Sequence, residues 1–132
     1  MPEKCPFCAA GDRYVVRHGR AAALWDAFPV NPGHALVVPV EHRRDLFECT
    51  PEELADMWTV IGLVKALIER EHAPAGYNIG TNVGAAAGQT VFHCHLHVIP
   101  RYEGDVDTPR GGVRRVKPPL VRYDDPEGRS SE

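Results

Sequence analysis

The clearest hydrophobic pattern in this chain belongs to one helix. Between residues 50 and 71 the apolar side chains recur every three or four positions, which is the spacing of an amphipathic helix. Thr50, Pro51 and Glu53 mark its start, because they supply an N-cap, a first-turn proline and a capping box. The helix is expected to end near Glu71, with an apolar stripe of Leu54, Met57, Ile61, Val64, Leu67 and Ile68. The charged residues that we expect largely off this stripe are Glu52, Glu53, Asp56, Lys65 and Glu69.

Shorter apolar runs on either side of the helix predict strands. Residues 14–16 and 22–25 fit a hairpin, and residues 35–39 and 77–82 predict two further strands. The longest predicted strand covers residues 90–100, after a loop of small residues at 83–89. We therefore expect an α+β fold, in which one long helix covers an antiparallel sheet of about five strands after a short N-terminal helix or turn.

Composition divides the chain into a core domain and a tail. Hydrophobic residues make up 43% and charged residues 25% of its 132 residues, which suits one globular domain. We expect this domain at residues 1–105 and an extended tail at 106–132, where prolines, glycines and mixed charges replace the apolar pattern. The basic residues at 109–114 fit either a solvated loop or a contact with a second phosphate or nucleoside.

Charge and cysteine content narrow the possible partners. The formal net charge is only -3 and the basic residues are scattered, which argues against a nucleic-acid partner and favours a small charged ligand. The sequence has no recognisable signal peptide or membrane-spanning run, so we expect a cytoplasmic protein with reduced thiols. Cys5 and Cys8 have the C-x-x-C spacing that lets two thiolates share a metal ion, whereas Cys49 and Cys94 are isolated in the sequence.

Three histidines alternate along the longest predicted strand. His93, His95 and His97 share one face of it, which leaves the other face to Phe92, Cys94, Leu96 and Val98. The apolar face fits against the helix. A lone histidine is usually a structural residue, but three on one face can divide the roles of nucleophile, acid and phosphate donor near neutral pH. The preceding loop offers backbone and side-chain groups suited to phosphate, at Gly84, Gly88, Gln89 and Thr90.

These residues resemble the histidine triad (HIT) family of nucleotide hydrolases and transferases. The stretch GQTVFHCHLHVIPR, from Gly88 to Arg101, is similar to the family's motif, and the pattern D-x-x-P-x-x-P-G-H from Asp26 is similar to its nucleoside-binding segment. The CPFC sequence at Cys5 resembles the zinc-binding bacterial branch. The resemblance implies that His95 attacks the α-phosphorus of a nucleotide, and that water then releases the monophosphate from a nucleotidyl-histidine intermediate.

The same resemblance implies roles for the residues around His95. His97 binds the phosphate and helps the leaving group, and His34 orients the triad from behind. The nucleotide-binding residues are Asp26 at the ribose hydroxyls, Asn82 at the phosphate or ribose, and Gln89 and Thr90 at the phosphate oxygens. The chemistry also requires one ring nitrogen of His95 to donate to a carbonyl, which leaves a lone pair on the other.

A structural zinc ion is the cofactor that the resemblance implies. Its ligands are Cys5, Cys8, His42 and His93, although a metal-free remnant of the site is an alternative. The family resemblance also implies a homodimer that forms through the long helix and its adjoining strand.

Four functions stay open at this point. The first is hydrolysis of an adenosine dinucleotide, such as a diadenosine polyphosphate, with release of AMP. The second is hydrolysis of a nucleoside phosphoramidate. A nucleotidyltransferase or phosphorylase is a third, although related transferases usually carry glutamine where this chain has His97. A zinc-containing nucleotide-binding module without catalytic activity is the fourth.

Overall fold

The computed structural model of the protein describes residues 5–121. The chain is divided into two compact units, of which the first ends at Arg101 and the second begins at Tyr102. Residues 122–132, the last part of the expected tail, lie outside the described residues.

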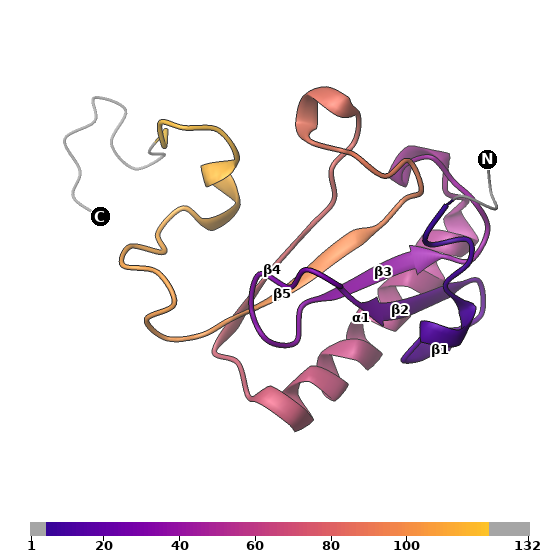
Figure 1. Ribbon diagram of the computed structural model, residues 1–132, viewed down its shortest axis with the longest axis horizontal. Helices are drawn as coiled ribbons and strands as arrows, with labels where there is room; N and C mark the ends of the chain where they lie inside the picture. Colours follow the sequence, from indigo (N-terminus) through magenta and orange to yellow (C-terminus); the bar gives the residue numbers. More distant parts are fainter. Residues whose placement is uncertain (1–4, 122–132) are drawn as a thin grey trace. The chain divides into compact units, whose positions relative to one another are not determined.

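The first unit is built on one antiparallel sheet with the strand order β1-β2-β3-β5-β4 (Figure 1). The expected α+β fold with five antiparallel strands is therefore confirmed. A 3-10 helix, Gly11–Arg13, lies at the position of the short N-terminal helix or turn. The strands are β1 (Val16–His18), β2 (Ala21–Trp25), β3 (Ala35–Pro39), β4 (Gly76–Gly80) and β5 (Leu96–Arg101).

The long helix, α1 (Pro51–His72), begins with the predicted capping box. The Thr50 hydroxyl accepts from the Glu53 N–H at 3.1 Å, and the Glu53 carboxylate accepts from the Thr50 N–H at 2.7 Å. The helix covers one face of the sheet, where its apolar residues pack with those of the strands (Figure 1). The helix residues buried there are Met57, Val60, Val64 and Ile68.

Three helix residues differ from the expected stripe, and the first is Val60, which was not part of the stripe but is fully buried. Glu53 is buried at 1% exposure, although we expected it largely off the stripe, and Leu54 is 39% exposed. Burial alone raises the pKa of Glu53, but hydrogen bonds from the Arg43 guanidinium and Thr50 hold it below the ordinary value. The buried carboxylate is stable because Arg43 donates to both of its oxygens.

Three predicted strand boundaries were wrong. The hairpin is confirmed, but its first strand lies at Val16–His18 instead of 14–16, and the strand expected at 77–82 is Gly76–Gly80. The strand expected at 90–100 is limited to Leu96–Arg101, because β3 and β4 pair with β5 only from Leu96 onward. Alternating residue character could not reveal that pairing with β3 and β4 begins only at Leu96 and His97.

The opposite face of the sheet is covered by the N-terminal segment. Its buried cluster joins Cys5, Phe7 and Ala10 to strand residues Leu24, Leu36 and Val38. The expected apolar face toward the helix is confirmed for Cys94, Leu96 and Val98 but not for Phe92, which is 44% exposed. The sheet therefore separates a helix-covered core from a face where the histidines can be placed.

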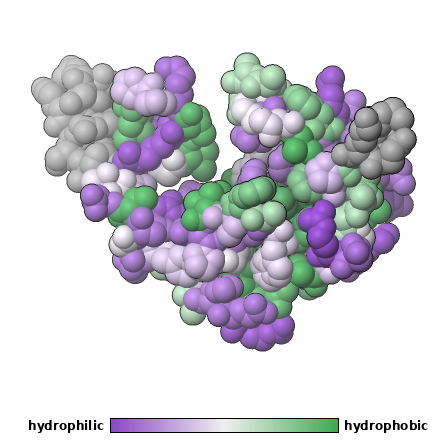
Figure 2. Space-filling model, viewed as in Figure 1, coloured by the Kyte–Doolittle hydropathy of each residue, from purple (hydrophilic) through white to green (hydrophobic). Residues whose placement is uncertain are grey.

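The second unit contains one short regular element within residues 102–121, the 3-10 helix Gly112–Val116. Each residue described there is at least partly exposed. In the described part of the chain, no helix combines the length and apolar character needed to cross a membrane. Figure 2 shows apolar and hydrophilic residues interspersed on the visible face of the protein.

Candidate active site and metal centre

The segment His93–His95 reaches the site without strand partners. Its backbone is held by groups from other parts of the chain: the Cys94 N–H donates to the Arg43 carbonyl at 2.6 Å, and the Thr81 hydroxyl donates to the His95 carbonyl at 2.7 Å. These contacts replace the ladder that we expected for a continuous strand. The segment is thus fixed although only His97 of the three histidines lies within β5.

His95 has the hydrogen bond that a nucleophilic imidazole requires. Its Nδ1 lies 2.8 Å from the carbonyl oxygen of His93. A carbonyl can only accept, so Nδ1 carries the proton and the Nε2 of the neutral ring keeps its lone pair. The arrangement prepares Nε2 to attack an electrophile.

His34 and His97 form a hydrogen-bonded pair beside His95. The Val30 N–H donates to His34 Nδ1 at 3.0 Å, so the proton of the neutral His34 ring lies on Nε2. That nitrogen is 3.0 Å from His97 Nδ1, which accepts and leaves the His97 proton on Nε2. The chain of bonds turns His97 into a fixed donor for an anionic group.

Burial keeps both of these imidazoles neutral near pH 7. Desolvation lowers the pKa of His34, and the nearby Asp26 carboxylate opposes this shift only in part. Desolvation also lowers the pKa of His97, helped by repulsion from His95 and His34. The ring centroids of His95 and His97 are 5.3 Å apart, which is close enough for the repulsion that lowers the pKa of His97.

Asp26 lies against the histidine pair. Its Oδ2 is 3.3 Å from His34 Nε2, and its Oδ1 accepts from the Phe28 N–H. Asp26, His34 and His97 offer donor atoms within 4.8 Å of one another. They do not suit a metal ion, because His34 Nε2 carries a proton while Val30 holds Nδ1. The cluster is better described as a hydrogen-bond network that orients His97.

The loop before the triad differs from an open phosphate cradle. The Gln89 amide accepts from the Gly84 N–H at 2.9 Å and donates to the Arg44 carbonyl at 2.7 Å and the Val91 carbonyl. The Gly88 N–H donates to Ala85. Gln89 is 4% exposed and therefore holds the loop in shape, whereas the expected role at phosphate oxygens would require these bonds to break.

Thr90 and Asn82 lie on the exposed side of this loop. Asn82 is placed beside Gly88, since a Cβ added there would lie 3.9 Å from its Nδ2. These two side chains are the better candidates for direct contact with a phosphate.

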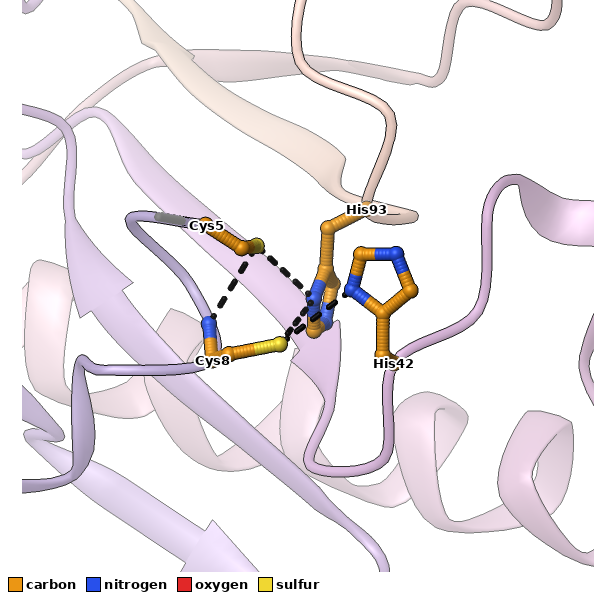
Figure 3. Close-up of side chains that lie close together, drawn as sticks. All are labelled: Cys5, Cys8, His42 and His93. Atoms are coloured by element: carbon orange, nitrogen blue, oxygen red, sulfur yellow. Dashed lines mark hydrogen bonds between the residues drawn. The ribbon is translucent and has the colours of Figure 1, made fainter. Parts of the chain in front are cut away.

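Four side chains converge on a second site at the N-terminal turn: Cys5, Cys8, His42 and His93 (Figure 3). His93 Nδ1 lies 3.4 Å from Cys5 Sγ and 3.5 Å from Cys8 Sγ, and His42 Nδ1 lies 3.2 Å from Cys8 Sγ. In a tetrahedral zinc site, bond lengths of about 2.3 Å to sulfur and about 2.0 Å to nitrogen put such ligands ~3.5 Å apart. The spacing suits a Cys2His2 zinc site.

The tautomer of His93 also suits a metal. His93 Nε2 lies 2.9 Å from the Pro39 carbonyl, so it carries the proton and Nδ1 presents its lone pair to the sulfur atoms. Burial and the adjacent Cys5 thiol raise the pKa of Cys8 to about 11. A divalent cation would stabilise the two thiolates that are unfavourable beside each other without it.

Three contributing residues were missed by the sequence analysis. Thr81 and Arg43 hold the backbone of the triad segment, and Phe7 packs its ring 5.0 Å from that of His95. Thr81 and Arg43 carry no local signal, because their partners are distant in sequence. Phe7 lies inside the C-x-x-C motif, where only the cysteines suggested chemistry.

Comparisons with known proteins agree with this geometry. The family model described as HIT domain matches residues 10–104. The chain is 37% identical to bis(5'-nucleosyl)-tetraphosphatase (asymmetrical) of Schizosaccharomyces pombe, across 80% of this chain and 59% of that protein. It is 36% identical to AP-4-A phosphorylase of Mycobacterium tuberculosis, across 82% of this chain and 57% of that protein. It thus spans less than two thirds of the length of either protein.

A solved structure is similar over the same region. It is a Zn-bound histidine triad family protein from Mycobacterium smegmatis, which is 37% identical with a TM-score of 0.70 over 80% of each chain.

We predict about one zinc ion per chain, bound at the four converging side chains. Replacing Cys8 by serine should remove the ion and lower the free energy of unfolding by at least about 2 kcal/mol, a fall on the order of 10 °C in Tm. Metal analysis and thermal unfolding measure both effects. Cys49→Ser is the matched control, because Cys49 lies outside the cluster, and it should retain the zinc. A zinc-free wild-type protein, purified without chelators, would show that the assignment is wrong.

We also predict that His34 titrates below the ordinary histidine pKa of 6.5. Asp26→Asn should lower the pKa further, since it removes the carboxylate that favours the charged ring. NMR titration of the His34 ring measures both. Glu69→Gln, which removes a carboxylate paired with Lys65 on α1, should leave the midpoint unchanged. A midpoint that rises in Asp26→Asn contradicts the prediction.

Proposed function

Because this chain belongs to the HIT family, we propose that it is a nucleotide hydrolase that cleaves an adenosine dinucleotide at the α-phosphate and releases AMP. The observation that carries the proposal is the hydrogen bond from His95 Nδ1 to the His93 carbonyl, which leaves a lone pair on Nε2. The relatives include proteins named as a tetraphosphatase and as a phosphorylase, so their names support nucleotide chemistry without selecting the reaction.

The proposed reaction has two displacements at phosphorus. His95 Nε2 attacks the α-phosphorus, and the bond to the bridging oxygen breaks, so that the remaining nucleoside polyphosphate departs with the electron pair. Water then attacks the phosphorus of the nucleotidyl-histidine and loses a proton to solvent. The P–N bond breaks, and its electron pair returns to Nε2 of His95. AMP is the product of the second step.

The surrounding residues bind and orient the substrate in this proposal. The His97 Nε2–H donates to phosphate oxygens in both steps, in the tautomer that His34 imposes. Thr90 and Asn82 contact phosphate or ribose, and Gln89 acts by shaping their loop. Asp26 holds the histidine pair through Oδ2, and its Oδ1, which also accepts from the Phe28 N–H, accepts from a ribose hydroxyl in the proposed complex. Cys5, Cys8, His42 and His93 hold zinc, which supplies structural rigidity.

The neutral state of His97 favours a polyphosphate over a phosphoramidate as substrate. A polyphosphate departs as a stable anion, whereas the amine of a phosphoramidate must gain a proton as it departs. Desolvation lowers the pKa of His97, so a smaller fraction of this residue carries a proton to donate near pH 7. Phosphoramidate hydrolysis is therefore the second candidate, and we expect it to be slower.

The proposed nucleophile can be tested with His95→Ala. The variant should lose at least about a thousandfold in kcat on a diadenosine polyphosphate, because no other group replaces the attacking nitrogen. His18→Ala, which removes a partly exposed imidazole on β1, is the matched control and should keep full activity. Nucleotide products measured by chromatography decide the outcome. Unchanged turnover in His95→Ala would exclude this nucleophile.

The same assay separates the other functions. Formation of ADP in place of AMP when inorganic phosphate is present would identify a phosphorylase. Faster turnover of adenosine phosphoramidate would select the second substrate class. Nucleotide binding without turnover by the wild-type protein would indicate a zinc-containing binding module. The expected cytoplasmic location stays a prediction.

We further propose a homodimer that forms through α1 and β4. β4 is an edge strand, and Ile79 on it is 43% exposed. Lys65 marks the flank of α1 that faces β4, because its Nζ lies 5.6 Å from the ring centroid of Tyr77, a residue of β4. Trp58 and Leu54 lie on that flank and are 75% and 39% exposed, so a second copy would cover apolar surface there.

Replacing Trp58 by glutamate should shift the protein from dimer to monomer, because it places a charge in an apolar contact. Leu63→Glu is the matched control. Leu63 is 45% exposed on the same helix but lies five residues away, a rotation of about 140°. Light scattering after size-exclusion chromatography measures the molecular mass. A monomeric wild-type protein, or equal dissociation by both variants, would contradict this interface.

A further inference from the structure

Phe7 connects the metal centre to the proposed nucleophile. It lies between Cys5 and Cys8 in sequence and is only 8% exposed. Its ring is edge-on to His93, with centroids 5.7 Å apart, and is tilted against His95 at 5.0 Å. One side chain of the N-terminal turn therefore touches both a metal-ligating histidine and the histidine that attacks phosphorus.

The position of Phe7 depends on the turn that carries the two thiols. The Cys8 N–H donates to Cys5 Sγ at 3.4 Å, and the Ala9 N–H donates to the Cys5 carbonyl at 3.3 Å. The Ala10 N–H donates to the Phe7 carbonyl at 3.4 Å. The two hydrogen bonds to carbonyl oxygens are long, so a metal ion that joined Cys5 and Cys8 to His42 and His93 would fix the turn more firmly.

The His95 ring needs support on the side that Phe7 occupies. The hydrogen bond from Nδ1 to the His93 carbonyl holds one edge of the ring but permits rocking about it. Contact with the Phe7 ring restricts that motion, and the remaining cluster residues behind Phe7 keep its own ring in place. A nucleophile held in one orientation reacts faster than one that samples several.

We propose that Phe7 is a positioning residue through which occupancy of the metal site sets the orientation of His95, so that metal binding increases turnover. The inference rests on the proposed function in its use of His95 as nucleophile. It adds Phe7 to the residues of that proposal, as the contact that links the metal site to His95. A second route runs through the backbone of His93, whose ring faces the metal site and whose carbonyl accepts from His95. The experiment must separate the two.

The first test compares ring-deleting and ring-retaining variants of Phe7. In the zinc-loaded protein, Phe7→Leu should lower kcat about tenfold and Phe7→Ala up to about a hundredfold, with KM little changed, because substrate contacts are made elsewhere. Phe7→Tyr retains the ring and should restore most of kcat. Tyr14→Ala is the matched control, since Tyr14 packs on the same cluster and is not among the rings that contact His95. Equal losses in Phe7→Leu and Tyr14→Ala would overturn the proposal.

The second test removes the metal from wild type and from Phe7→Leu. Chelation should lower kcat of the wild type about tenfold and have a much smaller effect in Phe7→Leu, because the contact that transmits the change is already absent. An equal fall in kcat in wild type and in Phe7→Leu would mean that the metal acts entirely through the His93 backbone, and it would overturn the role of Phe7. Zinc content is measured for each variant, and Phe7→Leu serves alone if Phe7→Ala does not retain zinc.

The third test measures the tautomer of the His95 ring directly, in the absence of substrate. Long-range proton–nitrogen NMR spectra at constant pH show which ring nitrogen carries the proton, and the signals that disappear in His95→Ala assign them. We expect one Nδ1–H tautomer in zinc-loaded wild type and averaged signals in Phe7→Leu and in the metal-free protein. Identical spectra in all three would overturn the inference. If His95→Ala instead retains turnover, the proposed function fails while this spectral comparison still tests the contact.

Discussion

The hydrogen bond from His95 Nδ1 to the His93 carbonyl constrains most of the site around it. It joins residues only two positions apart, so it forms only if the backbone between them keeps one conformation. This segment has no strand partner and depends on separate contacts from Pro39, Arg43 and Thr81. Pro39 and Arg43 lie at and just after the end of β3, and Thr81 follows β4, so the tautomer of one ring depends on two separate parts of the unit.

The sheet keeps that polar arrangement apart from the helix-covered core. Leu36 and His97 are opposite each other in β3 and β5, on the face that the N-terminal segment covers. Imidazoles are tolerated there because both nitrogens of His34 and Nδ1 of His97 find hydrogen-bond partners. The same burial lowers the pKa of both rings, so the site offers neutral donors to phosphate instead of positive charge.

Local features of the fold could be predicted from the sequence, and long-range ones could not. The helix and its capping box depend on neighbouring residues, so Thr50 and Glu53 were enough to place its start. The burial of Glu53 depends on Arg43, which lies ten positions earlier, so the residues next to Glu53 in sequence do not reveal it. The start of β5 at Leu96 depends on where its pairing with the distant strand β3 begins. The alternation of the histidines predicted their common face, but the side-chain bonds of Gln89 became visible only in three dimensions.

The two nitrogens of His93 explain how a metal site and a reactive site can share one segment. Nε2 is bonded to Pro39 in the sheet, and Nδ1 faces the cysteines, so the ring is anchored on one side whether or not the other holds an ion. Cys5 and Cys8 lie before residues 10–104, the range matched by the family model. A metal ion bound by the Cys5, Cys8, His42 and His93 cluster would therefore join a segment outside the matched domain to the backbone that orients His95. Because His93 contacts the proposed nucleophile, His95, through its carbonyl, coordination of the His93 ring could stabilise this backbone without occupying the group that His95 needs.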